Sequence, residues 1–239
     1  NVHFTYEDTN IEALKGISFE VQKGQTLAII GNTGSGKSTI LELIGRLYDV
    51  QKGQIEVDGQ TIQNLNLNSL RSSVGFVPQD PFLFSDSLRN NIKFGKNKAS
   101  DDEVVEASKM AVVHDNITNF KNGYDTVLGE RGITLSGGQK QRISIARAFI
   151  KNPQILLLDD CLSAVDTETE EQILNNIELV TKGKTTIIVS HRISSAKNAD
   201  IIVVLNNGII TQQGSHVQLI NVEGYYKELY QNQLREISS

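Results

Sequence analysis

The sequence predicts an α/β fold: a mostly parallel central sheet with flanking helices, into which a helical subdomain is inserted. Three observations predict this fold. Continuous apolar runs, typical of strands buried on both faces of a parallel sheet, recur along the chain and alternate with segments of helical periodicity. A glycine-rich phosphate-binding pattern directly follows the first of these runs. In the middle of the chain, two helical segments follow each other without an intervening strand.

The apolar runs predict the strands of the core, and their alternation with helices favours right-handed crossover connections. The strands are expected, in chain order, at residues 26–30, 74–77, 155–158, 185–189 and 201–205. The helices of the core are expected at residues 37–47, 167–180 and 193–198, with a last helix at 216–234.

The remaining segments define the ends of the core and the insertion. Residues 2–6 and 18–21 alternate apolar and polar positions, which predicts strands of an N-terminal antiparallel part. Residues 101–120 and 137–150 predict the two helices of the insertion. We therefore expect one domain over residues 1–239. It comprises a β core and a helical subdomain, expected at 1–80 plus 153–239 and at about 81–152.

The composition supports one sizeable core and argues against a nucleic-acid partner. Of 239 residues, 38% are hydrophobic, and 28 acidic against 23 basic residues give a net charge of −5. A broad nucleic-acid interface needs a clustered positive excess instead. No apolar run reaches the roughly 18–20 residues that span a bilayer, and the first residues predict a strand rather than a signal peptide. The lone Cys161 excludes an internal disulfide, and the missing initial Met suggests a piece of a longer polypeptide.

A phosphate-binding loop is predicted between the strand at 26–30 and the helix at 37–47. The residues that form the pattern G-x4-G-K-[ST] and its flank are Gly31, Asn32, Thr33, Gly34, Ser35, Gly36, Lys37, Ser38 and Thr39. Glycines let the backbone wrap a polyphosphate, and the following helix directs its positive dipole end toward it. Lys37 is expected to bind the β- and γ-phosphates, and Ser38 to bind Mg²⁺. The alternative, a chance glycine-rich turn, is disfavoured by the flanking strand and helix.

Asp159 is the candidate metal ligand. It follows the apolar run 155–158, so its carboxylate is expected at the carboxyl end of a strand, where ligands bind in open α/β sheets. Taken alone, the run could equally be a buried strand followed by an acidic turn. Together with the phosphate loop it favours a carboxylate that holds Mg²⁺ directly or through water.

A further motif, Leu-Ser-Gly-Gly-Gln at residues 135–139, precedes this acidic strand end. With the three motifs in this order, the chain resembles the nucleotide-binding domain of ATP-binding-cassette (ABC) proteins over essentially its whole length. Ser136 and the backbone of Gly137 and Gly138 are expected to cap the N-terminus of a helix running to residue 150. Together with Gln139 they are expected to bind phosphate at that end of the helix. The resemblance implies that this phosphate belongs to ATP on a second such domain, so that MgATP lies between the two.

The resemblance assigns three more residues. Tyr6 resembles the aromatic residue that stacks on adenine, Gln79 the glutamine that reaches Mg²⁺ and the attacking water, and His191 the switch histidine that contacts the γ-phosphate. Each also has a structural interpretation: Tyr6 as a core aromatic beside Phe4, Gln79 as a solvent-exposed residue, His191 as an ordinary structural histidine. The strands expected at 74–77 and 185–189 lead directly to Gln79 and His191, which favours the site roles.

Three loops carry the remaining resemblance. Residues 163–166 resemble the loop that communicates between the two composite sites, although Asp166 would also serve as a helix cap. Residues 125–132 resemble the exporter motif that touches the coupling helices of a membrane domain, and 81–85 also favour an exporter over an importer. The resemblance thus implies a transmembrane domain, fused N-terminally in the full protein, and a location at the cytoplasmic face of the cell membrane.

Asp160 departs from the family pattern, in which a glutamate at this position acts as general base on the attacking water. Its side chain is one methylene shorter, and a misplacement of about 1 Å can cost roughly 100-fold in rate. We expect this chain to bind MgATP, to hydrolyse it slowly, and to complete a partner's site with its intact signature, as one half of a heterodimeric exporter.

Three alternatives stay open at this point. One is a slow, self-sufficient homodimer, and another is a module that binds ATP without hydrolysing it. The third is a soluble ABC ATPase acting on DNA or ribosomes. That class usually carries a long coiled coil or a second cassette. This chain has neither, and its acidic charge also argues against a nucleic-acid function.

Overall fold

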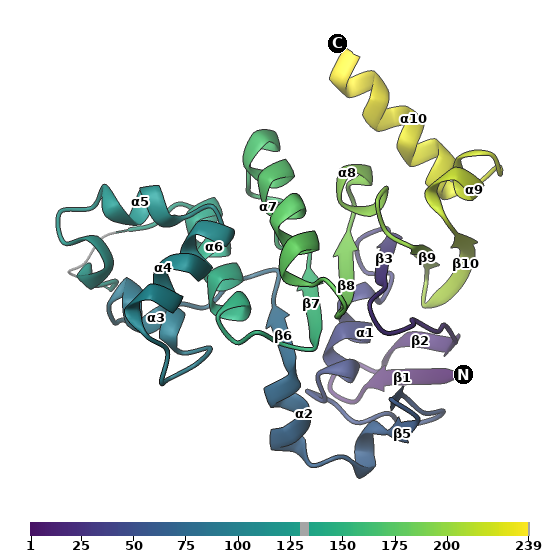
Figure 1. The fold of residues 1–239 in the computed structure, drawn as a ribbon. Helices are drawn as coiled ribbons and strands as arrows, with labels where there is room; N and C mark the ends of the chain where they lie inside the picture. The colour runs from purple at the N-terminus through teal and green to yellow at the C-terminus, as the bar shows by residue number, and fades with distance from the viewer. Residues whose placement is uncertain (130–133, 239) are drawn as a thin grey trace. The chain divides into compact units, whose positions relative to one another are not determined.

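Strands and helices alternate along the chain (Figure 1), and the α/β class predicted from the sequence is confirmed. The structure, a computed structural model, describes residues 1–129 and 134–238. The chain forms two compact units, Asn1–Val74 with Gly183–Ser239, and Gly75–Lys182.

The first unit is built on a sheet with a buried central strand. Strand β3 (Thr26–Gly31) pairs in parallel with β8 (Thr185–Ser190) on one side and β9 (Ile201–Asn206) on the other. Strand β10 (Ile209–Gly214) adds to β9 in antiparallel orientation, which gives the order β10-β9-β3-β8. Leu27 and its three successors in β3 are fully buried, as a strand covered on both faces requires. The three parallel strands were expected within one residue of these bounds.

An N-terminal hairpin completes the β part of this unit. Strand β1 (Val2–Tyr6) pairs antiparallel with β2 (Ile11–Ile17). The predicted strand at residues 18–21 is therefore wrong, because β2 lies earlier in the chain and ends at Ile17. Two register shifts interrupt the pairing, and Gly16 adopts a positive φ of 79°. These irregularities break the two-residue alternation by which a strand is recognised in sequence.

Two-residue turns close two further hairpins that the sequence analysis did not predict. Strands β4 (Glu56–Val57) and β5 (Gln60–Thr61) flank Asp58-Gly59, and β9 and β10 flank Asn207-Gly208. Both residues of each turn have positive φ, which is the reason that Asp-Gly and Asn-Gly pairs occur in such turns.

Helices of the first unit differ from expectation mainly at their ends. They are α1 (Lys37–Ile44), the 3₁₀ helix η1 (Ile62–Asn64), α2 (Leu67–Ser73), α8 (Ile193–Ala196), α9 (His216–Ile220) and α10 (Tyr225–Ser238). Helix α1 stops before Gly45, three residues earlier than predicted. The single helix expected at 216–234 is two helices, α9 and α10, separated by residues 221–224, where Gly224 has a φ of 149°. The far end of α10, in yellow, extends away from the sheet of this unit (Figure 1).

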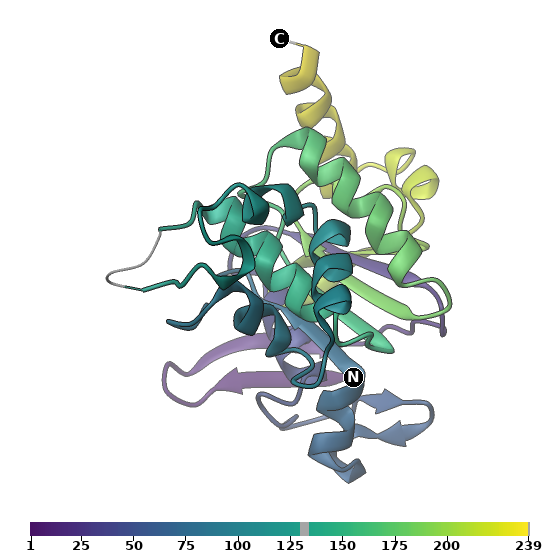
Figure 2. The same ribbon diagram turned by 60° about the vertical axis from the view of Figure 1, so that its left-hand side comes forward.

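The second unit is built from two strands and a set of helices. They are β6 (Val74–Val77), α3 (Leu88–Lys93), α4 (Asp101–Met110), α5 (His114–Thr118), the 3₁₀ helix η2 (Gly123–Asp125), α6 (Gly137–Phe149), β7 (Ile155–Asp159) and α7 (Thr167–Val180). Strands β6 and β7 are neighbours, and α3 and α4 pack against α6 (Figures 1 and 2). Within the ranges that the structure describes, no helix has both the length and the hydropathy to span a bilayer.

The helix predicted at 101–120 is interrupted. Helix α4 ends at Met110, and Val112 adopts a left-handed φ of 55° before α5 begins at His114. At this break the carbonyl oxygen of Val112 accepts a hydrogen bond of 2.5 Å from Arg142 Nη1 on α6. The contact depends on a residue 30 positions away, so helical periodicity alone could not predict the interruption.

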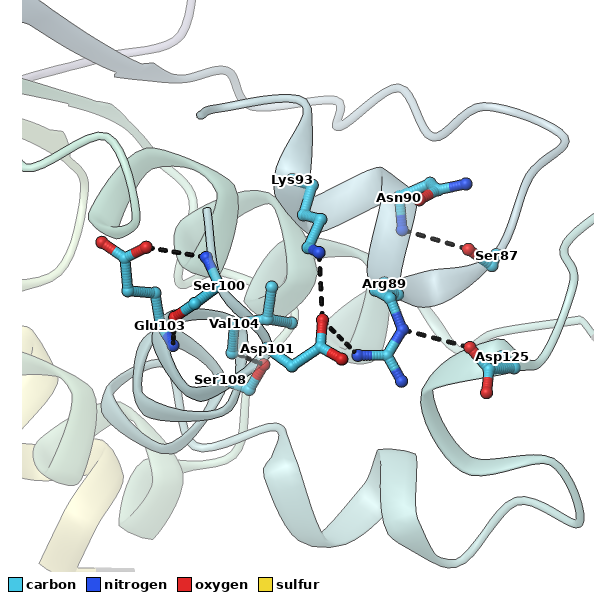
Figure 3. A network of polar contacts seen from close by, with 10 residues as sticks. All are labelled: Ser87, Arg89, Asn90, Lys93, Ser100, Asp101, Glu103, Val104, Ser108 and Asp125. Atoms are coloured by element: carbon cyan, nitrogen blue, oxygen red, sulfur yellow. Dashed lines mark hydrogen bonds and ion pairs between the residues drawn. The ribbon is translucent and has the colours of Figure 1, made fainter. Parts of the chain in front are cut away.

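A network of charged side chains joins α3 to the segments around it (Figure 3). Asp101, at the start of α4, contacts Arg89 Nη1 at 2.8 Å and Lys93 Nζ at 3.0 Å, and Arg89 Nε bonds Asp125 at 3.1 Å. The hydrogen bond from Lys93 is the main reason that the pKa of Asp101 lies below its usual value. Ser100 and Glu103 form a capping box at the N-terminus of α4.

Asn91 on α3 is buried and holds the loop that precedes its helix. Its amide exchanges two hydrogen bonds with the backbone of Phe84, accepting from N at 2.8 Å and donating to O at 3.0 Å. It also donates to the carbonyl of Ser87 at 3.0 Å. From α6, Arg147 Nη2 donates to Asn91 Oδ1 at 3.1 Å and Arg147 Nη1 donates to the carbonyl of Phe82 at 2.8 Å. One buried amide and one guanidinium therefore shape the segment 82–87.

Asn91→Ala is expected to lower the free energy of unfolding by about 2–3 kcal/mol, because buried backbone groups of the loop lose their partners. Asn90→Ala is the matched control. Asn90 is the exposed neighbour on the same helix, and its loss should change stability by less than about 0.5 kcal/mol. Urea denaturation of both variants measures the difference. Equal stabilities would contradict the role assigned to Asn91.

Candidate functional site

The phosphate loop runs from the end of β3 to the start of α1 and is shaped by close backbone contacts. A Cβ on Gly31 would stand 2.1 Å from the carbonyl oxygen of Leu205, and a Cβ on Gly36 would stand 2.5 Å from that of Ala13. Gly36 also has a φ of 100°. Gly34, with a φ of 77°, faces open space. Two of the three glycines are thus required by packing, and all three leave backbone that a ligand can approach.

The polar groups of this loop fit a polyphosphate. Lys37 Nζ donates hydrogen bonds of 2.8 Å to the carbonyl oxygens of Gly31 and Asn32, so its charge lies over the loop. Gly36 gives helix α1 no side-chain cap, and Ser38 and Thr39 follow in its first turn. The buried hydroxyl of Ser35 has no hydrogen-bond partner in the described part of the chain. An uncapped helix start, an ammonium group and an unsatisfied buried hydroxyl are features expected where an anion binds.

The turn between β9 and β10 is hydrogen-bonded to the phosphate loop and to strand β2. The backbone N–H of Gly208 donates to the carbonyl of Ser35 at 3.0 Å, and the carbonyl of Gly208 accepts from Lys15 N at 2.9 Å. Gly208 has a φ of 80°, and a Cβ there would stand 2.7 Å from the carbonyl oxygen of Ala13. The turn therefore fits tightly between β2 and the phosphate loop. Gly208 was not predicted as part of the site, although Asn-Gly between two apolar runs is a recognisable hairpin signal.

Tyr6 is half-buried at the end of β1 and is bonded to helix α1. Its hydroxyl donates to Glu42 Oε2 at 2.8 Å and lies 2.9 Å from Thr39 Oγ1. Its ring meets those of Phe4 and Tyr48 edge-on, with centroids 5.0 and 5.5 Å away. Burial is the main cause that raises the pKa of Tyr6 to about 12. Phe4 is buried in the core, whereas the Tyr6 hydroxyl is bonded to the helix that follows the phosphate loop.

His191 follows β8 directly and is exposed. Ser190 pairs with Ile30 of β3, so His191 and Gly31 leave the sheet at the same level, at the carboxyl ends of adjacent parallel strands. This is the edge at which α/β sheets bind ligands. The first unit therefore brings together the phosphate loop, Tyr6 and His191.

In the second unit, the signature motif begins helix α6. Ser136 caps the helix by accepting from Gln139 N at 3.2 Å, while the Gln139 side chain accepts from Ser136 N at 3.0 Å. The predicted cap is confirmed, and it takes the form of a capping box in which Gln139 is engaged with Ser136. Ser136 and Gly137 are exposed, so the start of this helix is open to a ligand.

Gln141, one turn into α6, joins the signature to two other motifs. It is 4% exposed. Its Nε2 donates to the carbonyl of Gln79 at 3.5 Å, and its Oε1 accepts from Ala164 N at 3.2 Å. A Cβ on Gly138 would stand 2.8 Å from the carbonyl oxygen of Ala164. Gln141 was not predicted from the sequence as part of the site. The signal in the sequence was that Gln141 lies four residues before Ile145 and so shares the apolar face of the helix, where a polar side chain needs a hydrogen-bond partner.

The acidic pair ends strand β7, and both carboxylates are buried. Asp160 has a left-handed φ of 44°, and its carbonyl accepts from Ser163 Oγ at 3.0 Å. The next residue, Cys161, is buried, which raises the pKa of its thiol. Asp166 caps α7 by accepting from Thr169 N at 2.9 Å, a hydrogen bond that lowers the pKa of its carboxyl group. The cap that local chemistry suggested for Asp166 is therefore present.

The predicted exporter motif at 125–132 lies partly outside the described residues, which end at 129 and resume at 134. Its described part forms an isolated antiparallel bridge, Ser87 with Val127, flanked by Leu88 N to Thr126 O at 2.9 Å and Leu128 N to Asp86 O at 3.0 Å. Residues 126–128 are thus tied to the segment that follows Gln79.

The sequence profile of a known family, described as ABC transporter, matches residues 14–163. The chain belongs to the ABC transporter family. ATP-binding domains of this family hydrolyse ATP, and the family assignment and the phosphate-loop α/β fold predicted from the sequence are confirmed.

Relatives of this ABC transporter domain are longer proteins. It is 51% identical over 233 residues to ATP-binding cassette sub-family B member 6 of Xenopus tropicalis, covering 98% of this chain and 27% of that protein. It is 46% identical over 236 residues to heavy metal tolerance factor 1 of Caenorhabditis elegans, covering 99% of this chain and 29% of the relative. It also resembles the structure of a bacterial Atm1-family ABC exporter with ATP bound, with a TM-score of 0.92 and 46% identity over 97% of this chain and 41% of that one.

The supporting turn of this ABC transporter domain can be tested with Gly208→Ala. We expect it to weaken ATP binding about ten-fold, because a Cβ 2.7 Å from the Ala13 carbonyl must displace the turn that bonds Ser35. Gly59→Ala is the matched control: Gly59 has the same kind of turn, a φ of 73°, and no atom within 4 Å of its Cβ.

Both variants should lose about 1 kcal/mol of folding stability from the unfavourable φ. Isothermal titration with MgATP and urea denaturation measure the two effects separately. If both variants bind ATP as the original chain does, the β9–β10 turn does not support the phosphate loop.

Proposed function

We propose that this chain is the ATP-hydrolysing motor domain of an exporter, in which MgATP lies between two such domains. The observation that carries the proposal is that one chain contains two helix N-termini suited to bind phosphate. Helix α1 follows the phosphate loop without a side-chain cap, and α6 begins with the exposed signature residues Ser136 and Gly137. Each favours phosphate, and in the ABC family the two act on different ATP molecules. A second copy or a paralogous domain is therefore the proposed partner.

The proposed roles follow from the residue types at the motif positions and from the resemblance to the family. Lys37 and the loop from Gly31 to Thr39 hold the phosphates, and Tyr6 stacks on the adenine ring. Ser38, Gln79 and Asp159 are the proposed ligands of Mg²⁺, which supplies positive charge against the phosphate oxygens when bound. His191 contacts the γ-phosphate, and Gln79 and Asp160 orient and activate the attacking water. Ser136, Gly137, Gly138 and Gln139 bind the partner's ATP.

Asp160 is proposed to make this chain's own site slow. Its carbonyl is tied to Ser163 and its φ is left-handed, so the backbone has little freedom to move the shorter carboxylate forward. A general base acts only within hydrogen-bond reach of the water that it deprotonates. The intact signature then serves a partner's ATP, which fits one half of a heterodimeric exporter. A homodimer with two slow sites is the alternative.

The membrane partner is proposed to dock on the second unit. Phe82 and Phe94 are 67% and 60% exposed, and Arg147 stacks on Phe94 and Phe84 at 5.6 Å, which holds these rings at the surface. Exposed aromatic clusters commonly mark interaction sites. The names of the relatives favour an exporter: one is described as an ABC exporter and another as a heavy metal tolerance factor. On this proposal the domain works at the cytoplasmic face of a membrane.

A soluble ATPase acting on DNA or ribosomes is less well supported. Binding to a nucleic acid surface would need a basic face, and the net charge is −5.

Lys37→Ala tests the ATP site directly. Loss of the ammonium group is expected to weaken MgATP binding by roughly 100-fold, because charge-assisted hydrogen bonds to phosphate contribute about 1.5–3 kcal/mol. Lys23→Ala removes an equal charge from an exposed position of the same unit and should leave affinity unchanged. Titration calorimetry with MgATP measures both. Equal affinity in the two variants would reject ATP binding at this loop.

Asp160→Glu tests the slow site. We expect kcat to rise at least about ten-fold with little change in ATP affinity, because the longer carboxylate restores the reach of the base. Asp160→Asn, which has no basic carboxylate, should lower kcat below that of the original chain. Phosphate release at saturating MgATP measures all three. The idea of a degenerate site fails if the original chain already turns over as fast as Asp160→Glu.

A further inference from the structure

Gln233 on the C-terminal helix α10 holds the backbone around the switch histidine. Its Nε2 donates to the carbonyl oxygen of His191 at 2.8 Å, and its Oε1 accepts from the backbone N–H of Ile193, also at 2.8 Å. The two bonds lie on either side of Arg192 and use both ends of one amide group. Only one orientation of the amide satisfies both partners, since a carbonyl cannot donate and an N–H cannot accept.

Gln233 bonds the start of helix α8, where the N-cap residue supplies no side-chain cap. That N-cap residue is Arg192. The first N–H groups of a helix have no partner within the helix, and Ile193, which is buried, carries the first of them. Ser190 Oγ accepts from Arg192 N at 3.0 Å, and Gln233 satisfies Ile193 N. A residue 40 positions further along the chain therefore completes the cap.

Gln233 can hold the loop because α10 is anchored to the core of the same unit. Tyr226 is fully buried in a cluster that also contains Ile193 of α8 and Ile30 of β3, with Leu229 and Tyr230 packed against it. The Tyr226 hydroxyl lies 2.9 Å from His216 Nδ1 on α9. Tyr226, Leu229, Tyr230 and Gln233 have the spacing i, i+3, i+4, i+7, which places them on one face of a helix. Gln233 is the polar end of a face on which Tyr226 is buried and Leu229 and Tyr230 are partly buried.

We propose that Gln233 is a positioning residue for His191: it sets the backbone from which the histidine reaches the γ-phosphate, so that the C-terminal helix controls the rate of hydrolysis. The inference rests on the proposed role of His191. Gln233 does not touch nucleotide on this proposal. Its loss should therefore reduce kcat and leave ATP affinity, which the phosphate loop determines, unchanged.

The test compares Gln233→Leu with Gln231→Leu in the 239-residue chain. Gln231 is an exposed glutamine on the same helix, so the control makes the same chemical change without touching the loop. Hydrogen exchange should show the amide of Ile193 exchanging about five- to ten-fold faster in Gln233→Leu and at the original rate in Gln231→Leu, because one hydrogen bond is lost. In Gln233→Leu, kcat should fall about ten-fold with the Kd for MgATP unchanged.

Two further variants make the result specific. If Gln233 acts through the histidine, adding Gln233→Leu to His191→Ala should lower kcat no further than His191→Ala alone. Gln233→Glu keeps the acceptor for Ile193 N but cannot donate to His191 O, and it replaces Gln233→Leu if the leucine variant does not fold. With this variant kcat should fall while the exchange of Ile193 stays slow.

The proposal is overturned if Ile193 exchanges equally fast in Gln233→Leu and Gln231→Leu, if both variants have the same kcat, or if the losses from His191→Ala and Gln233→Leu multiply. Failure of the proposed function would give a different set of results. If His191→Ala leaves kcat unchanged while Lys37→Ala abolishes ATP binding, His191 has no role in hydrolysis and the control of rate by Gln233 falls with it.

Discussion

The phosphate loop depends on backbone approaching backbone too closely for any side chain. Leu205 of β9 and Ala13 of β2 bring their carbonyl oxygens to within 2.1 and 2.5 Å of where Cβ atoms would stand on Gly31 and Gly36. Because these contacts are between backbone atoms, no side chain can adjust to relieve them. The sheet and the hairpins around the loop therefore determine its shape. The β9–β10 turn extends the same principle, since Gly208 is bonded to Ser35 on one side and to Lys15 on the other. The rest of the first unit, from Tyr6 at the end of β1 to His191 beyond β8, is built on this frame.

The second unit uses a different device, polar side chains of one helix that reach into loops. From α6, Gln141 bonds the backbone of Gln79 and of Ala164, and Arg147 bonds the backbone of Phe82 and Asn91. Buried polar groups are costly unless satisfied, so each of these loops has a strong preference for one arrangement. The helix that presents the signature is therefore bonded to the segments that carry the proposed water-orienting glutamine and the docking surface. A shift of α6 would therefore move both the Gln79 segment and the proposed docking surface. A motor domain needs coupling of this kind.

Prediction from sequence succeeded where the determining pattern is local. The buried strands β3, β7, β8 and β9 and helices α6 and α7 were expected close to their observed bounds, and the Ser136 cap was expected as well. Apolar runs, helical periodicity and serine caps are short-range signals. It failed at 18–21, where bulges displace the strand, and at 101–120, where Val112 turns to meet Arg142. The helix expected at 216–234 is split at residues 221–224, where Gly224 has a φ of 149°. In the site, every motif residue was named, but the residues that hold the motifs in place, Gln141, Gly208 and Gln233, were not.

The sequence by itself determined the family, the phosphate loop and the signature, since each is a compact pattern whose glycines, lysine or serine are needed by the chemistry at that position. It also determined that Asp160 departs from the pattern. The tertiary structure alone decided which side chains support these motifs. His191 and Gln233 are 42 residues apart and meet because α8 and α10 pack on one core. Hydrogen bonds between a side chain and distant backbone leave no periodic trace in the sequence, because any backbone offers the same N–H and carbonyl groups.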